Sequence, residues 1–298
     1  MAILLKLRNR KSPQLLHNQN MAWHVFKQNK AAVVALLFIV AVVLFCYVGP
    51  WFYHSNQTDA SAGLFFTNLP PQRGFPLGTD SQGYDILGRI MFGGQTSLEV
   101  GLLSALVAMT WGAIYGLVSG YRGGAIDAVL MRIVDALLSI PGLFLLLALM
   151  AVFSRSELLL VLVLGLTGWY GVARLTRSEA LALRNREYVS AVRSMGGGST
   201  RIIRRHILPN SVSTLITVTT FTIGDSILAL SALGFLQLGV PLPKTDWGTM
   251  LNTGIQSIQL NQWWQVYPVA FVFLVLVISF NYVGDALRDV FEVRLRTQ

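Results

Sequence analysis

Residues 187–209 read EYVSAVRSMGGGSTRIIRRHILP and lie between two long apolar segments of the chain. The stretch is basic and contains three consecutive glycines, whereas the flanking segments carry almost no charge. So many arginines are too costly to place in the hydrocarbon of a bilayer. The pattern predicts an integral membrane protein that exposes this stretch to water beside the membrane.

The composition favours the same class of protein. The 298 residues are 53% hydrophobic and 12% charged, whereas soluble domains contain about 25% charged residues. The single cysteine, Cys46, excludes an intrachain disulfide and a cysteine-based metal site. The four histidines show no His-Glu-x-x-His spacing, so we expect no bound metal.

Six segments are long and apolar enough to cross a bilayer, which takes about 20 mostly apolar residues. They cover residues 31–52, 97–120, 128–153, 158–175, 212–236 and 266–287. The first begins after 30 residues and lacks a small-x-small cleavage site, so we expect a retained helix and not a signal peptide. The predicted fold is all-α with six transmembrane helices.

Lysine and arginine gather on alternate connections between these segments. One side holds Lys6, Arg8, Arg10, Lys11, Lys27, Lys30, Arg122, Arg177, Arg184, Arg186, Arg193, Arg201, Arg204, Arg205, Arg288, Arg294 and Arg296. The other side holds only Arg73, Arg89, Arg155 and Lys244. Cytoplasmic loops carry the positive excess, so we predict that both termini are cytoplasmic. The net charge of +9 is then a topology signal, and we expect no nucleic-acid partner.

This topology divides the chain into a basic cytoplasmic segment (1–30), a first transmembrane helix (31–53), an external loop (54–96), a five-helix core (97–287) and a cytoplasmic tail (288–298). A long cytoplasmic loop, residues 176–210, interrupts the core. In the external loop, residues 78–85 (GTDSQGYD) lack the ligand spacing of a calcium loop. We prefer a turn in which Asp80 or Ser81 caps the next helix.

The cytoplasmic loop is predicted to form a short helix, a turn and a second short stretch. Glu187, Ala191 and Met195 follow one another at helical spacing, and Tyr188 and Val192 share an apolar face with Met195. Glycines end this helix because glycine accepts a left-handed cap; they are Gly196, Gly197 and Gly198.

Pro209 interrupts the helical pattern, and Asn210 or Ser211 is expected to cap the next membrane helix. From the residues alone, two environments remain open for the short amphipathic helix at 187–198. It lies on anionic lipid, or it fits a groove on a partner protein.

Small and charged residues inside the apolar segments indicate contacts. Gly112, Gly116 and Gly120 recur every four residues and predict a close helix contact, either within the chain or with a partner subunit. Pro141 should kink the third segment, and Arg132 and Asp135 are spaced to form an ion pair there.

Asp225 falls within the fifth segment, where an ionised residue is costly and usually faces a cavity or a partner. It is a candidate for lining a transport pathway. A structural ion pair and a position near the helix mouth are the alternatives.

Motifs of several enzyme classes are absent from the sequence. There is no Gly-x-x-x-x-Gly-Lys-Ser/Thr phosphate loop, so we expect no ATP hydrolysis by this chain. There is no Gly-x-Ser-x-Gly and no metal-ligand cluster. A secondary transporter typically has internal repeats, which the sequence does not show.

Five separated segments together resemble the C-type permease subunit of oligopeptide and dipeptide ABC importers, in the binding-protein-dependent transport inner-membrane component family. They contain residues 77–87 (LGTDSQGYDIL), the glycine and aspartate pattern of 119–142, the loop at 187–209, the Leu-Gly-Phe-Leu and Trp-Gly pattern of 233–251, and residues 281–289 (NYVGDALRD). The resemblance covers roughly residues 25–296 in one order.

The resemblance implies a type I ABC importer permease fold. It also implies an ATP-driven import of di- or oligopeptides across the bacterial cytoplasmic membrane by alternating access. The implied partners are a second homologous permease, two cytoplasmic ATPases and an extracytoplasmic solute-binding protein. ATP and Mg²⁺ would be bound by the ATPases, and this chain would bind no cofactor.

In this resemblance the helix that contacts the ATPases covers residues 187–198, with Ala191 and Gly196 at the motif positions. The family's motif Glu falls on Ser190, and its second Ala falls on Val192, which leaves Glu187 to supply an acidic contact. Alternative cargoes are nickel chelates, glutathione or antimicrobial peptides. A proton-coupled carrier that uses Asp225 and a scaffold without transport are the alternatives from other classes.

Overall fold

The computed structural model describes residues 26–58, 66–153 and 155–296. This described part is helical and has no β-strand. Its helices are α3 (Lys30–Phe52), α4 (Ile86–Arg122), α5 (Gly124–Leu138), α6 (Gly142–Val152), α7 (Glu157–Arg184), α8 (Glu187–Ser194), α9 (Ser199–Ile202), α10 (Leu208–Phe235), α11 (Trp247–Ile255) and α12 (Tyr267–Arg296). The predicted all-α class is confirmed.

Five helical runs have the length and hydropathy of membrane spans: α3, α4, α7, Ser199–Phe235 and Trp263–Phe291. A sixth span exists only if α5 and α6 count as one, because they are bent by 79° relative to each other. Pro141 lies at this bend and has no backbone N–H to donate. The predicted kink in the third segment is therefore a break between two helices.

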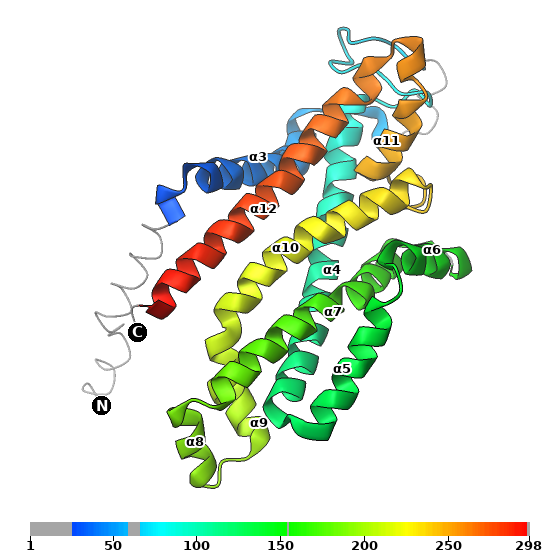
Figure 1. Ribbon diagram of the computed structural model, residues 1–298. Helices are drawn as coiled ribbons and strands as arrows, with labels where there is room; N and C mark the ends of the chain where they lie inside the picture. Colours follow the sequence, from blue (N-terminus) through cyan, green and yellow to red (C-terminus); the bar gives the residue numbers. More distant parts are fainter. Residues whose placement is uncertain (1–25, 59–65, 154, 297–298) are drawn as a thin grey trace, which may run out of the picture.

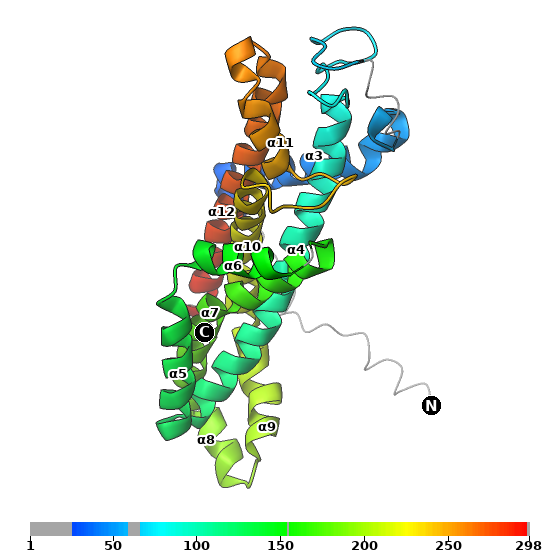
Figure 2. The ribbon, with the colours of Figure 1, turned by 90° about the vertical axis from the view of Figure 1, so that its right-hand side faces the viewer.

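The two ends of the molecule differ in what they carry. Figure 2 shows α8 and α9 together at one end, and α11 with the loop before α4 toward the opposite end. We call these the α8 end and the loop end. Phe26 and Ala32 pack on Ala286 and Val290 near the end of α12, so the two described ends of the chain lie together.

Helices α4 and α7 run parallel to each other and end together at the α8 end (Figure 1). At the start of α7, Arg155 donates to the carbonyl oxygen of Gln237 at 2.5 Å, and Lys244 pairs with Glu157. The start of α7 thus lies beside the loop that follows α10. The chain must return from the end of α4 to this level, and it does so through α5 and α6.

Helix α4 begins earlier than the hydropathy pattern indicates, at Ile86 and not at residue 97. Its N-cap is Asp85, whose carboxylate accepts hydrogen bonds from the backbone N–H groups of Leu87 and Gly88. The prediction that Asp80 or Ser81 caps this helix is wrong. Asp80 instead holds the preceding turn by accepting from the N–H groups of Gln82 and Tyr84.

The fifth span also begins earlier than expected, because Pro209 does not end the helix before it. A π-helical turn, Ile203–Ile207, joins α9 to α10 and places Pro209 in the first turn of α10. The wider turn accommodates a residue that has no N–H to donate. Asn210 and Ser211 therefore do not cap a helix, and their side chains donate to the carbonyl groups of His206 and Ile207.

Candidate coupling surface and transport face

The short helix α8 ends in a tight glycine turn. Gly196 has φ +81°, a left-handed conformation that glycine adopts without strain. The N–H of Gly197 donates to the carbonyl oxygen of Val192 at 2.9 Å and closes the turn. A Cβ on Gly197 would lie 2.6 Å from Val192 Cγ1, so no side chain fits there. The predicted helix and glycine turn are both present in the structure.

A small apolar cluster anchors this helix to the long helices. Val189 of α8 is fully buried among residues of α4, α7 and the α9–α10 run, which are Leu117, Tyr121, Ala180, Ile202 and Ile207. The guanidinium of Arg193 lies 5.4 Å from the centroid of the Tyr121 ring. One packed cluster therefore holds α8 against α4, α7 and the α9–α10 run.

The outer side of α8 is open and presents two large apolar side chains, Tyr188 and the C-cap residue Met195. Met195 is 78% exposed and Tyr188 is 41% exposed, and Glu187 and Ala191 are exposed beside them. Val192, which the spacing places on the same face, is partly buried against the anchoring cluster. We call Glu187, Tyr188, Ala191 and Met195 the coupling surface.

The glycines at 112, 116 and 120 pack within the chain. A Cβ on Gly112 would lie 2.5 Å from Val172 Cβ, and one on Gly120 would lie 2.5 Å from the carbonyl oxygen of Arg177. These glycines let α4 and α7 approach closely along their length. Of the two alternatives open at the sequence level, the contact is the one within the chain.

Two ion pairs join α5 to α7. Asp127 receives two hydrogen bonds from Arg177, at 2.5 and 2.6 Å, and a third from the hydroxyl of Ser119 at 2.6 Å. Asp135 pairs with Arg174 at 2.5 Å. The predicted pair of Asp135 with Arg132 is wrong. Asp135 pairs with Arg174 of α7 and not with Arg132, which lies one turn earlier on α5.

Asp225 is exposed on the surface of α10. It has no hydrogen-bond or ion-pair partner within residues 26–58, 66–153 and 155–296. The structure therefore does not place Asp225 in an intrachain ion pair. Glu179 of α7 accepts a hydrogen bond from Thr214 of α10 at 2.7 Å.

At the loop end, Asp246 fixes α11 against α10. Its fully buried carboxylate accepts from the N–H and hydroxyl groups of Thr249, at 2.9 and 2.7 Å. A Cβ on Gly234 or Gly239 would lie 2.1 or 2.4 Å from a carboxylate oxygen, so glycine is required at both positions. Burial raises the pKa of Asp246 above its usual value.

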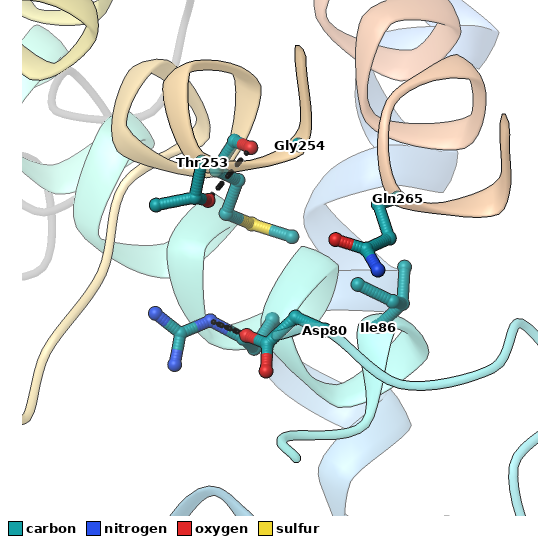
Figure 3. Close-up of a pocket in the computed structure, with 7 residues that line it drawn as sticks. Asp80, Ile86, Thr253, Gly254 and Gln265 are labelled. Atoms are coloured by element: carbon teal, nitrogen blue, oxygen red, sulfur yellow. Dashed lines mark hydrogen bonds and ion pairs between the residues drawn. The ribbon is translucent and has the colours of Figure 1, made fainter. Parts of the chain in front are cut away.

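A small cavity lies beneath α11. Figure 3 shows Asp80 on one side of it, with Thr253 and Gly254 of α11 and Gln265 on the others. Arg89 lies 3.4 Å from the Asp80 carboxylate through Nε, while its buried Nη1 has no partner. The space of about 10 Å³ suits one water molecule. No group of three or more metal-ligating side chains occurs in the described ranges.

Comparison with known proteins decides the family. Residues 91–297 match the family described as "Binding-protein-dependent transport system inner membrane component". The chain belongs to this family. Residues 20–71 also match the family described as "N-terminal TM domain of oligopeptide transport permease C". This inner-membrane transport component is thus a permease subunit, as the sequence resemblance implied.

Curated relatives cover most of the permease. It is 36% identical over 286 residues to the dipeptide transport system permease protein DppC of Bacillus subtilis (strain 168). The aligned region covers 96% of this chain and 88% of the relative. It is 34% identical over 271 residues to the oligopeptide transport system permease protein OppC of Escherichia coli (strain K12). The aligned region covers 91% of this chain and 89% of the relative.

A solved structure shares the fold of the permease. The structure titled "Inward facing conformations of the MetNI methionine ABC transporter" matches with a TM-score of 0.55 at 19% identity, and the match covers 68% of this chain and 96% of that chain. The expected type I ABC importer permease fold is therefore present, with five or six spans.

Sequence reasoning missed three features of the permease. Val189 was not separated from its exposed neighbours, although it follows Tyr188 by one position and so projects about 100° further around the helix. No sequence pattern marked Asp246, which lies between the fifth and sixth predicted spans. The Asp127–Arg177 pair joins residues about 50 positions apart, and no local spacing indicates it.

Proposed function

We propose that this chain is one of two permease subunits of an ATP-driven importer that carries di- or oligopeptides across the bacterial cytoplasmic membrane. The proposed cargo follows the printed names of relatives that align with more than nine-tenths of this chain. The observation that carries the mechanism is the coupling surface, an exposed apolar face on a helix whose other face is locked into the protein by Val189.

In this proposal the α8 end faces the cytoplasm, together with both termini. Two ATPase subunits bind ATP and Mg²⁺ and receive Tyr188 and Met195 in a groove on their surface. Glu187 and Ala191 border the contact, while Gly196 and Gly197 fix its end. This chain itself carries no phosphate loop and hydrolyses no ATP.

Closure of the two ATPases would move α8 and, through the Val189 cluster, the packed helices α4, α7 and α10. The loop end then opens toward an extracytoplasmic solute-binding protein that delivers the cargo. A second homologous permease would complete the pathway, and Asp225, on the open surface of α10, would line it.

The test is purification of the tagged chain from its native membrane in mild detergent, followed by identification of the bound proteins by mass spectrometry. The variant Met195→Asp places a charge on the coupling surface without disturbing a buried contact, because Met195 is 78% exposed. The matched control is Leu260→Asp at the loop end, where Leu260 is 69% exposed.

We expect the wild type and Leu260→Asp to retain a second permease and two ATPases. Met195→Asp should retain the second permease and lose the ATPases. Retention of the ATPases by Met195→Asp would place the contact elsewhere on the chain. Recovery of the wild-type chain alone in several detergents would contradict the importer and favour a self-contained carrier.

A further inference from the structure

Asp225 lies deep in its membrane span. It is ten residues before the end of α10 at Phe235, which is about 15 Å along an α-helix. The hydrocarbon core is about 30 Å thick, so this carboxylate lies near its middle. An ionised aspartate at that depth is costly unless water or a counter-charge reaches it.

The other sides of α10 are already occupied by helices of the same chain. Ile227 packs against Gly101 of α4, and Gly224 packs against Phe280 of α12. Leu215 packs with Val172 of α7. Asp225 lies on the remaining open side of α10, between the contacts with α7 and α12.

A second polar contact lies on this open side. Thr214 precedes Asp225 by about three helical turns, so the two residues share one face of α10, about 16 Å apart. Thr214 donates to Glu179 of α7 at 2.7 Å. Thr214 and Asp225 thus place polar groups at two depths along this side of α10.

The basic residues of α7 at the depth of Thr214 point away from the open side of α10. Arg174 and Arg177 of α7 are directed at α5, where Asp135 and Asp127 neutralise them. Neither guanidinium therefore offers a counter-charge to Asp225, which has no ion-pair partner in the described residues. A negative charge on the surface of a pathway attracts ions of the opposite sign.

We propose that Asp225 determines the charge preference of transport and transiently pairs with ammonium or guanidinium groups of the cargo. The inference rests on the proposed function, because it takes the open face of α10 as part of the pathway. Cationic peptides then pass faster than anionic peptides of equal size. The pairing is brief because the carboxylate remains exposed to water in the pathway.

The test uses the complete importer in proteoliposomes, with its binding protein in saturating excess and ATP supplied to the ATPases. The cargoes are Ala-Lys-Ala, Ala-Gln-Ala and Ala-Glu-Ala, which have the same termini and differ in one side chain. The variants are Asp225→Asn and Asp225→Glu. Glu179→Gln is the matched control, because its amide oxygen still accepts the Thr214 hydroxyl.

We expect wild type to carry the Lys peptide at least about threefold faster than the Glu peptide. Asp225→Asn should bring the two rates to within about a factor of 1.5, while Asp225→Glu retains the preference. Glu179→Gln should change the ratio little. All variants should keep the second permease and the ATPases, since Asp225 has no hydrogen-bond or ion-pair partner in the described residues and Glu179→Gln keeps the acceptor of the Thr214 hydroxyl.

Two results would overturn the proposal. An unchanged ratio of Lys to Glu peptide rates in Asp225→Asn would remove Asp225 from cargo selection. Loss of the second permease from Asp225→Asn would instead assign Asp225 to an ion pair between subunits. If wild type carries none of the three peptides although its partners are bound, the proposed cargo fails and not the assignment of Asp225.

Discussion

Gly116 of α4 lies directly against Thr176 of α7. A Cβ on Gly116 would lie 2.0 Å from Thr176 Oγ1 and 2.3 Å from the carbonyl oxygen of Ala173. The same hydroxyl lies 2.8 Å from the carbonyl oxygen of Val172 on its own helix and 3.0 Å from that of Gly112 on α4. This contact lies between those of Gly112 and Gly120 in the pairing of α4 with α7.

We therefore expect Gly116→Ala to destabilise the permease by about 1–3 kcal/mol, the usual effect of overpacking. The matched control is Gly171→Ala on α7, where a Cβ meets nothing within 4 Å. The measurement is the midpoint of thermal unfolding in detergent, with size-exclusion chromatography as the readout. Equal midpoints for the two variants would contradict this packing.

The Asp127–Arg177 pair should behave as a coupled unit. Arg177→Gln leaves Asp127, whose side chain is 12% exposed, without its counter-charge. We expect a loss of about 2 kcal/mol or more, because an unpaired buried charge costs more than the absent pair. Adding Asp127→Asn should recover part of this loss. A double-mutant cycle measures the coupling, and strictly additive effects would argue against it.

Stability should fall with rising pH over the window in which Asp246 titrates in the folded protein. Burial raises the pKa of Asp246 from its usual 3.8. Between the pKa of Asp246 in the unfolded chain and its raised pKa in the folded protein, the folded state binds more protons than the unfolded state. The free energy of unfolding therefore decreases as pH rises. Asp80 and Asp85 of the same end contribute with the same sign, since burial also raises their pKa values.

Thermal midpoints measured from about pH 4 to about pH 7 test this linkage. Asp246→Asn should show a smaller slope than wild type, whatever its absolute stability, because it has no proton to lose there. An Asp246→Asn slope as steep as that of wild type would exclude Asp246 as the titrating group.

The turn after α8 should tolerate substitution at one glycine and not at another. Gly196 has φ +81° in open space, so Gly196→Ala should cost about 1 kcal/mol through backbone strain alone. Gly198 has φ −68° and is equally open, so Gly198→Ala should cost much less. Hydrogen exchange of the α8 amides reports the difference. Faster exchange in Gly198→Ala than in Gly196→Ala would reverse the assignment.

Local sequence patterns predicted the apolar spans and the glycine turn well, because both depend on neighbouring residues. Asp80 and Asp85 show the limit of this reasoning. Each is an aspartate in a glycine-rich turn, and spacing alone does not reveal which one ends the loop. The structure separates them because Arg89, one turn inside α4, reaches back to Asp80 and leaves Asp85 to cap the helix.

The sequence by itself determined a helical membrane protein, the approximate position of its spans and the exposed basic loop, since hydropathy and glycine content act over a few residues. The tertiary structure alone decided which helices meet. In the folded chain α4 and α7 are parallel, and Asp135 forms an ion pair with Arg174. Val189 is buried, and Asp225 is exposed. These outcomes depend on the packing of residues far apart in the chain, and helical periodicity within one segment contains no information about its neighbour.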